Sequence, residues 1–354
     1  MQFRFGRRWL PGSHIPCIKF FEEIPMSRTI KFAKPGGPEV LQFVEVDVPA
    51  PGADEVRIKV KAIGINRAES MWRTDQYIEP VTFPAGLGYE AAGLVDAVGP
   101  NVTGVAVGDV VSVMPSFSQN QYFTYGEIVT LPIHAVVKHP ASLSFEEAAS
   151  VWMMFVTAYG ALVEDATVGK GDFVVISAAS SSVGLAAIQV AAYQGAIPIA
   201  LTRTSAKKQQ LFDAGAAHVI ATEETDLVQE VLRITDGQGA RVVFDPIGGA
   251  NFAKLISIIS FQGIVYLYGA LAEGPAHLPV LDMIAKMPVV KGHNIWLTSG
   301  DDARRKAAVE YVVKGLEAGA LKPVIDRTFR FDEMVDVHRY LENNGQFGKI
   351  VVTV

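Results

Sequence analysis

Cysteine is almost absent from this sequence of 354 residues, whose only one, Cys17, lies before Met26. From Met26 onward the chain therefore cannot form a disulfide, bind zinc through thiolates or use a cysteine nucleophile. Histidine does not take over this role, because the seven histidines are scattered without the spacing of metal ligands. We expect each of them to lie on the surface or in a loop, and we predict that the protein holds no metal.

Long apolar runs and an excess of positive charge are also missing. A membrane-spanning helix needs about 20 apolar residues, and the best stretch, 151–163, is shorter and contains Thr157, Tyr159 and Gly160. The formal net charge of −6 gives no electrostatic footprint for nucleic acid. Residues 1–25 lack the uninterrupted apolar core of a secretory signal. We therefore expect a cytoplasmic protein without a membrane or nucleic-acid partner, in which residues 1–25 are a disordered extension or not native.

The sequence after Met26 begins with short strands and turns. Residues 55–65 alternate between apolar and charged side chains, a period of two that indicates a half-buried strand. The pattern changes at Ser144, which forms a capping box with Glu147 and predicts a helix that continues to about Leu162. Beyond this helix, apolar runs typical of buried strands alternate with helical segments. The six expected strands are residues 173–177, 197–202, 218–221, 241–245, 263–268 and 289–294.

This alternation predicts an α/β fold in which a doubly wound, six-stranded parallel sheet follows a β-rich domain. The last part of the chain, with helices expected at 302–318 and 334–343 and strands at 327–331 and 349–354, has no partner in that sheet. We expect it to return and complete the β-rich domain. The predicted boundaries are 26–146 with 299–354 for the β-rich domain and 147–298 for the nucleotide-binding domain.

The turn after the first strand of the predicted sheet indicates a phosphate site. Residues 173–176 form a short apolar strand, residues 177–184 are mostly small, and an alanine-rich helix follows. A strand, a tight turn and a helix N-terminus together present free backbone N–H groups to a phosphate. The pyrophosphate of a dinucleotide is therefore expected at Ser180, Ser181, Ser182, Val183 and Gly184.

The residues around the end of the second strand of this sheet favour NADPH over NADH. NAD-specific sites place an Asp or Glu about 20 residues past the turn, but here no acid follows the strand before Asp213. Arg203 and Lys207 are present instead, and their cations attract the 2′-phosphate that a carboxylate would repel. We predict that Thr202, Arg203 and Lys207 bind this end of NADPH. The open alternative is that the two cations only decorate an exposed helix start.

Five short motifs, each weak alone, occur together in the order and spacing of a known family. From Met26 to Val354 the chain resembles the medium-chain dehydrogenase/reductase superfamily, and within it the zinc-free quinone oxidoreductase and enone reductase branch. The resemblance implies a GroES-like catalytic domain, a Rossmann domain and a cleft between them that holds NADPH. The motifs are GINRAE at 64–69, GLGYEAAG at 86–93, VGDVV at 107–111, TAY at 157–159 and GKIV at 348–351.

The resemblance also bears on metal and catalysis. Zinc-dependent members bind zinc through a Cys and a His at the positions of Asn66 and Tyr89, and neither of these is a usual zinc ligand. Without zinc, hydrogen-bond donors must stabilise the charge that develops on the substrate oxygen. Asn66 can donate through its amide. Tyr77 lies eleven residues later, where a tyrosine of enoyl reductase relatives polarises the carbonyl or delivers a proton.

Three further residues are implied as cofactor contacts. The family counterpart of Thr157 approaches the nicotinamide, Gly269 would let the cofactor pass near the backbone, and Lys349 is expected to contact the cofactor. Alternatives to the two catalytic roles stay open, namely a turn-stabilising side chain for Asn66 and a packed aromatic ring for Tyr77.

The function expected from these observations is hydride transfer from NADPH, without a metal, to a quinone or to the C=C bond of an α,β-unsaturated carbonyl compound. The alternatives are an alcohol dehydrogenase, zinc-independent or zinc-type, and a non-catalytic NADPH-binding protein. We expect a small apolar carbonyl or quinone substrate, and the choice between them stays open. The resemblance further implies a homodimer joined at an edge strand of the Rossmann sheet, residues 265–268 or 290–296.

Overall fold

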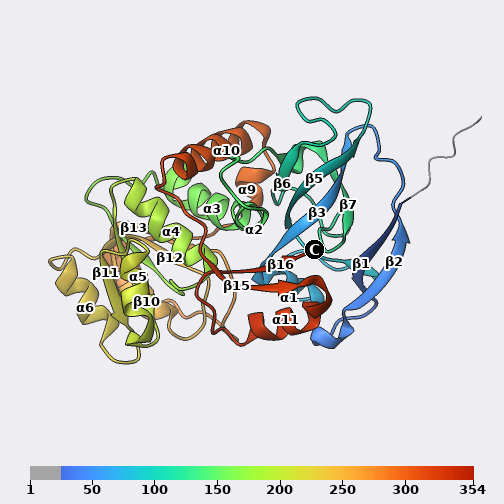
Figure 1. Cartoon of the computed structure of the whole chain (residues 1–354). Helices are drawn as coiled ribbons and strands as arrows, with labels where there is room; N and C mark the ends of the chain where they lie inside the picture. The colour runs from blue at the N-terminus through green and yellow to red at the C-terminus, as the bar shows by residue number, and fades with distance from the viewer. Residues whose placement is uncertain (1–24) are drawn as a thin grey trace, which may run out of the picture.

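The computed structural model describes residues 25–354 (Figure 1), so the expectations for residues 1–24 and for Cys17 lie outside the described residues. Figure 1 shows the Rossmann sheet and its helices on one side and the β-rich sheets on the other. Among residues 25–354, no helix combines the length and the apolar character needed to cross a bilayer.

The predicted six-stranded parallel sheet is confirmed. Its strand order is β11-β10-β9-β12-β13-β14, the order of a doubly wound nucleotide-binding fold, in which β9 is the first strand and lies near the middle. All pairs of neighbouring strands are parallel. The strands are β9 (Phe173–Ile176), β10 (Ile197–Thr202), β11 (His218–Ala221), β12 (Ala240–Asp245), β13 (Ile259–Leu267) and β14 (Val289–Gly292).

Apolar side chains cover both faces of this sheet, which explains why its strands are continuously apolar in sequence. In β9, Val174 and Ile176 belong to one buried cluster and Val175 to another, on the opposite face. The helices of this half are α4 (Ser182–Tyr193), α5 (Lys208–Asp213), α6 (Leu227–Ile234), α7 (Phe252–Ser257), α8 (Val280–Lys286) and α9 (Trp296–Ser299).

The β-rich half contains a seven-stranded sheet and a three-stranded sheet. The first has the order β15-β16-β3-β5-β6-β8, with β7 also paired to β3, and the second has the order β2-β1-β4. The strands are β1 (Met26–Phe32), β2 (Gln42–Asp47), β3 (Glu55–Ile65), β4 (Ala85–Gly86), β5 (Glu90–Val98), β6 (Val110–Val113), β7 (Ile128–Pro132), β8 (Val136–Val137), β15 (Ile325–Arg330) and β16 (Lys349–Thr353). Helices α1 (Arg67–Arg73) and α11 (Met334–Glu342) lie beside them.

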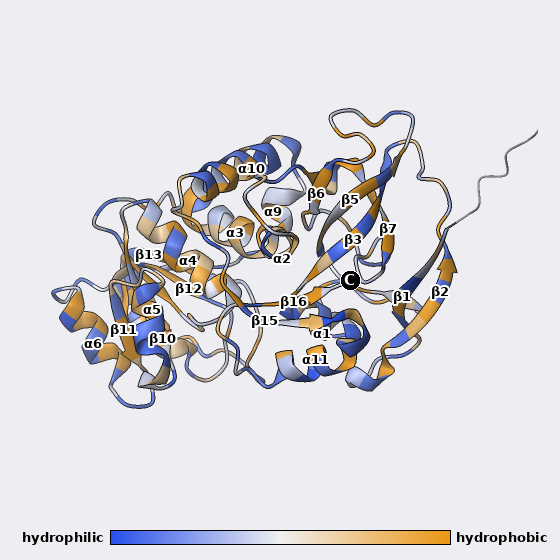
Figure 2. Ribbon diagram, in the orientation of Figure 1, coloured by the Kyte–Doolittle hydropathy of each residue, from blue (hydrophilic) through white to orange (hydrophobic). Residues whose placement is uncertain are grey.

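The return of the C-terminal strands to the β-rich sheet is confirmed, whereas the helix expected at 302–318 does not join them. Strand β16 pairs antiparallel with β3, so that Ile350 lies opposite Ile65. In Figure 2, β12 and β16 are largely apolar, whereas much of α10 (Asp302–Glu317) is hydrophilic. Helix α10 packs against the Rossmann half, where the Tyr311 ring lies 4.9 Å from the Tyr159 ring. The predicted domain boundaries stay a prediction.

The single helix expected from Ser144 to Leu162 is wrong, although its capping box forms. The chain makes α2 (Phe145–Ala148), then α3 (Trp152–Tyr159) and a π-helical turn over Gly160–Asp165. The break has a tertiary cause, because the Met153 N–H donates to Glu90 Oε1 at 2.8 Å instead of extending the earlier helix. Every residue of α3 is buried, as expected for a helix apolar on all sides that lies between two sheets.

Candidate active site

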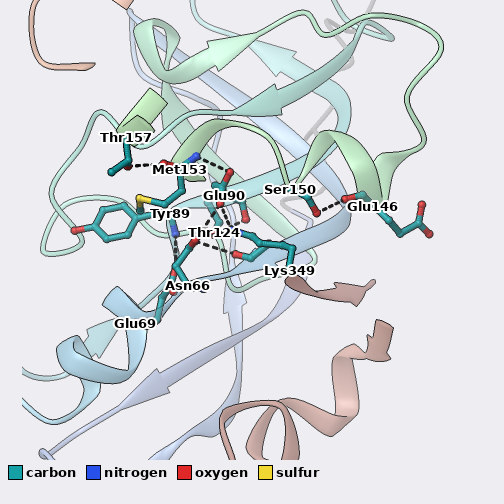
Figure 3. Close-up of polar contacts among 11 residues, drawn as sticks. Asn66, Glu69, Tyr89, Glu90, Thr124, Glu146, Ser150, Met153, Thr157 and Lys349 are labelled. Carbon is teal, nitrogen blue, oxygen red and sulfur yellow. Dashed lines mark hydrogen bonds and ion pairs between the residues drawn. The ribbon is translucent and has the colours of Figure 1, made fainter. Parts of the chain in front are cut away.

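Strand register brings three polar residues from distant parts of the sequence together inside the protein. Asn66 follows the end of β3, Glu90 begins β5 and Lys349 begins β16, and β3 pairs with both other strands. The Lys349 ammonium donates to Glu90 Oε2 and, at 2.5 Å, to Asn66 Oδ1 (Figure 3). Glu90 and Lys349 are almost fully excluded from solvent, and their opposite charges compensate one another there.

Glu69 adds a second buried carboxylate to this group. It lies in the first turn of α1 and accepts from the backbone N–H of Asn66 at 2.5 Å and of Tyr89 at 3.3 Å. Burial raises the pKa of the Glu69 carboxyl to about 7, and the nearby Glu90 also raises it, while Lys349 and Asn66 act in the opposite direction. We call Asn66, Glu69, Glu90 and Lys349 the buried charge network.

Asn66 and Lys349 therefore have roles within this network. The Asn66 amide donates to Glu90 at 3.1 Å and to Glu69 at 3.2 Å, while its oxygen accepts from Lys349. This arrangement agrees with the turn-stabilising alternative, because Asn66 is also the N-cap of α1. A hydrogen bond from the Asn66 amide to a substrate stays a prediction. To form it, the amide would have to give up its bond to Glu69 or to Glu90. Cofactor contact by Lys349 likewise stays a prediction.

Gly64 is required beside the network by close packing. A Cβ atom at this position would lie 1.9 Å from the carbonyl oxygen of Ala149 and 3.1 Å from the Lys349 side chain. The glycine of the GINRAE motif thus lets β3 approach the connection between α2 and α3.

Aromatic rings form a wall next to the network. The Tyr89 ring lies 6.3 Å from the Tyr77 ring, 5.8 Å from Phe117 and 6.0 Å from Trp296, measured between centroids. Tyr77 is partly exposed. Burial raises the pKa of the Tyr77 phenol to about 12, so its hydroxyl keeps its proton at neutral pH. Both the proton-donor role and the packed-aromatic alternative agree with this position.

The nucleotide turn connects β9 to α4 and has the geometry of a phosphate site. Ser182 and Val183 are the first residues of α4, where backbone N–H groups have no partner within the helix. A Cβ on Gly184 would lie 2.6 Å from the carbonyl oxygen of Ala178, so this glycine permits close packing of helix and strand. Ser181 is the N-cap, and its Oγ accepts from the Gly184 N–H at 3.1 Å.

The C-terminal segment lies against this turn, which the sequence pattern did not reveal. The Gly348 N–H donates to the Ser180 carbonyl at 2.9 Å. The Lys207 ammonium donates to the carbonyl oxygens of Gly345 at 2.9 Å and Gln346 at 2.8 Å, and it lies 3.4 Å from Ser180 Oγ. Lys207 thus stands beside the expected phosphate turn, as its predicted role requires.

Thr202 ends β10, and Arg203 is exposed just after it. The predicted contacts of both residues with the 2′-phosphate stay predictions. Sequence spacing missed an acid in this region, because Glu224 follows the next strand, β11. Its carboxylate accepts from the Ser205 backbone N–H at 2.8 Å and from the Ser205 hydroxyl at 3.2 Å.

The other two predicted contacts have structural partners. Thr157, in α3, donates its hydroxyl to the Met153 carbonyl at 2.5 Å and is 6% exposed. A Cβ on Gly269 would lie 2.8 Å from the Pro246 carbonyl oxygen, which gives this glycine a packing reason. Their cofactor contacts stay predictions.

The expectation that every histidine lies on the surface or in a loop is wrong for His338. It is fully buried in α11, its Nε2 lies 3.4 Å from the Tyr125 hydroxyl, and burial lowers its pKa to about 3. His293 is in a loop but also buried, with Nε2 2.9 Å from the Thr157 carbonyl oxygen. Within residues 25–354, no group of three or more His, Cys, Asp or Glu side chains is arranged to hold a metal ion.

Two family models match the chain. One, described as a zinc-binding dehydrogenase, matches residues 182–311, and the other, described as an alcohol dehydrogenase GroES-like domain, matches residues 52–141. Quinone oxidoreductase 1 of Escherichia coli strain K12 is 34% identical over 244 residues, which cover 69% of this chain and 73% of that protein. The chain belongs to the medium-chain dehydrogenase/reductase superfamily, in its quinone oxidoreductase branch.

Solved structures of this superfamily share the fold over most of the chain. An Escherichia coli quinone oxidoreductase complexed with NADPH has a TM-score of 0.84 at 28% identity, covering 92% of this chain and all of that one. A structure described as an NAD-dependent alcohol dehydrogenase has a TM-score of 0.83 at 31% identity, covering 92% of this chain and 99% of that one. The resemblance expected from the short motifs is therefore confirmed.

The buried charge network predicts a pH dependence of stability. Folding raises the Glu69 pKa from 4.5 to about 7, so the folded protein binds this proton more tightly than the unfolded chain. The associated stability is present below pH 4.5 and is lost as the pH rises to 7. We expect the unfolding free energy of the wild type to fall by up to about 1.4 kcal/mol per pH unit between about pH 5 and 7, relative to Glu69→Gln.

Urea denaturation across this pH range measures the effect. The exposed Glu317 supplies the control, because Glu317→Gln should keep the pH profile of the wild type. Parallel profiles for the wild type and Glu69→Gln would contradict the prediction.

Proposed function

We propose that this oxidoreductase uses NADPH to reduce a quinone or the C=C bond of an α,β-unsaturated carbonyl compound without a metal ion. The main support for this proposal is that Asn66 and Tyr89 occupy the two positions at which zinc-dependent members hold their zinc ligands. Asn66 is engaged by Lys349 and Glu90, and Tyr89 lies in an aromatic wall. A lysine ammonium supplies the positive charge of this network, and Asn66 and Tyr89, which stand at the two ligand positions, are not usual zinc ligands.

The nucleotide turn fits NADPH. The first N–H groups of α4 face the position of a pyrophosphate, Gly184 leaves no side chain between helix and strand, and Lys207 lies next to Ser180. When bound, NADPH supplies the hydride. Ser182 and Val183 hold the pyrophosphate through their backbone N–H groups, and Arg203 and Lys207 hold the 2′-phosphate.

The aromatic wall and Tyr77 serve the acceptor. Rings such as Phe117 and Trp296 exclude water from an apolar substrate. The Tyr77 hydroxyl keeps its proton at neutral pH. In the proposed reaction it donates this proton to the reduced substrate.

An acceptor screen tests this function. We expect the purified protein to oxidise NADPH steadily with 9,10-phenanthrenequinone, 2-cyclohexenone or crotonyl-CoA, and the rate to be unchanged after dialysis against EDTA. Absorbance at 340 nm measures the rate. Failure to oxidise NADPH with any acceptor would favour a non-catalytic NADPH-binding protein. Alcohol oxidation that depends on stoichiometric zinc would favour a zinc-type dehydrogenase.

Lys207→Ala tests the cofactor preference. A hydrogen bond to a charged group contributes about 1.5–3 kcal/mol, so we expect KM for NADPH to rise roughly 10- to 100-fold while KM for NADH changes little. The neighbouring Lys208 is exposed, and Lys208→Ala should leave both values unchanged. An equal change for the two cofactors in Lys207→Ala would contradict the assignment.

The proposal includes a homodimer at the open edge of the Rossmann sheet. Strand β13 lies inside the sheet, so of the two candidates only β14 stands at an edge. Next to it, α8 exposes apolar side chains, with Leu281 81% and Ile284 68% accessible. Unpaired strand edges and exposed apolar patches are both features of interaction surfaces.

Leu281→Asp tests this interface. A charge placed in an apolar contact should weaken the dimer at least tenfold, or by about 1.4 kcal/mol. Sedimentation velocity measures the dimer fraction against concentration. Val107 is exposed in the β-rich half, and Val107→Asp is expected to remain dimeric. A monomeric wild type would contradict the proposal.

A further inference from the structure

Tyr89, in the aromatic wall, and the nearby Gln119 each bury a polar group that lacks a close hydrogen-bond partner. Tyr89 is 0% and Gln119 1% exposed. Within the described residues, neither the Tyr89 hydroxyl nor the Gln119 amide nitrogen has a partner at normal hydrogen-bond distance, although the amide is near enough to lower the pKa of the phenol. Buried polar groups are nearly always paired, because an unpaired one loses its bonds to water without compensation. Two unpaired donors in one place therefore point to a ligand that pairs with them.

The direction of the Gln119 amide is fixed by its other end. Its Oε1 accepts from the Gly88 backbone N–H at 2.5 Å. Exchange of the amide oxygen and nitrogen would bring two N–H groups against each other, so the –NH₂ group must be the free end. Gly88 directly precedes Tyr89, so the Gln119 amide is fixed beside the backbone from which the Tyr89 ring extends.

The same turn is anchored to the buried charge network. The Tyr89 N–H donates to Glu69 Oε1 at 3.3 Å. In Figure 3 the Tyr89 ring extends away from the Lys349–Glu90 pair, so that the hydroxyl is carried out of the network. The network therefore holds the backbone of Tyr89 and leaves its hydroxyl for another partner.

The location of the pair is that of a ligand site. Trp296, whose ring contacts Tyr89 at 6.0 Å, follows the carboxyl end of β14. Open α/β sheets bind their ligands outside the carboxyl ends of the strands. Tyr89 thus reaches from the β-rich half to the edge of the Rossmann sheet at which a nucleotide binds.

The Tyr89 phenol keeps its proton at this location. Burial raises its pKa above the ordinary value, and the Tyr77 side chain raises it further, while Gln119 acts in the opposite direction. A neutral phenol and a carboxamide –NH₂ are both donors, suited to an oxygen that gains negative charge.

We propose that the Tyr89 hydroxyl and the Gln119 amide form the oxyanion site that binds the carbonyl oxygen of the substrate. This inference rests on the proposed function. As hydride adds to the β-carbon of an enone, or to one oxygen of a quinone, the π electrons move onto the carbonyl oxygen at the other end of the conjugated system, and the enolate or hydroquinone monoanion accepts hydrogen bonds from both donors. One proton, delivered from Tyr77 or from solvent, then completes the reduction. Tyr77, which is partly exposed beside Tyr89, is the side chain that yields to the entering substrate.

Tyr89→Phe removes one donor and keeps the ring. Loss of a single oxyanion donor lowers kcat roughly 100- to 1,000-fold, and this is the fall we expect with the best acceptor from the screen. The midpoint of thermal unfolding should change little, because the hydroxyl makes no hydrogen bond at normal distance. Tyr340→Phe is the matched control, since Tyr340 lies in α11 and its hydroxyl donates to Asp326 at 2.7 Å, and kcat should not change.

Gln119→Glu replaces the second donor while its carboxyl can still accept from Gly88. At pH 8 the introduced carboxylate repels the developing charge, so kcat should fall. It should recover as the pH is lowered and the carboxyl regains a proton to donate. A merely structural role would not give this pH profile.

Binding of 4-nitrophenolate tests the site without turnover, since this anion presents an oxygen to the two donors. Its absorbance shift should give an affinity that is at least tenfold weaker in Tyr89→Phe. Unchanged kcat and phenolate affinity in Tyr89→Phe, with an active wild type, would overturn the oxyanion site alone. A wild type that binds phenolate through Tyr89 but oxidises no NADPH would instead overturn the proposed function and leave the oxyanion site standing.

Discussion

The buried ion pair between Lys349 and Glu90 is the interaction on which the centre of the protein depends. Removal of two charges from water costs several kcal/mol for each ion, and mutual attraction offsets this cost only with further hydrogen bonds. Those bonds come from Asn66, at the end of β3, and from the Met153 N–H, at the start of α3. A pair that is separated by 259 residues in sequence therefore fixes the meeting point of the C-terminal strand, the β-rich sheet and the central helix.

The sequence predicted the parts of the fold that depend on local pattern. Alternating apolar strands and helices predicted the six-stranded parallel sheet, and four of its strands have bounds within one residue of those expected. The helix from Ser144 failed because its interruption depends on Glu90, which the local pattern around Met153 does not contain. His338 was misjudged for the same reason, since burial in α11 is decided by packing. Contacts between residues far apart in the sequence produce no periodic pattern of apolar residues, so the local sequence could not predict them.

The sequence predicted where the phosphate turn lies, but not which of its groups are already hydrogen-bonded. The serine cluster correctly marked the turn between β9 and α4, and it allowed a serine N-cap, but the sequence did not show which serine it would be; Ser181 takes the Gly184 N–H. That bond stabilises the helix and removes one donor from a phosphate. Lys207 lies next to Ser180, so a positive charge stands close to the turn that has lost this donor. Tertiary structure therefore decides both which backbone N–H groups remain free for a phosphate and where the Lys207 ammonium lies.

At the aromatic wall, the contrast between paired and unpaired polar groups separates the supporting network from the proposed oxyanion site. Asn66 is nearly saturated with partners, whereas Tyr89 and Gln119 each keep a donor without one. Stability alone would favour removal of such donors, and proteins retain destabilising features mainly where activity needs them. Both donors are held by neighbours that are fully engaged, because Glu69 fixes the Tyr89 backbone and Gly88 fixes the Gln119 amide. A saturated network that supports an unsaturated pair is the arrangement required of a preorganised oxyanion site, since its donors need no reorganisation when charge develops.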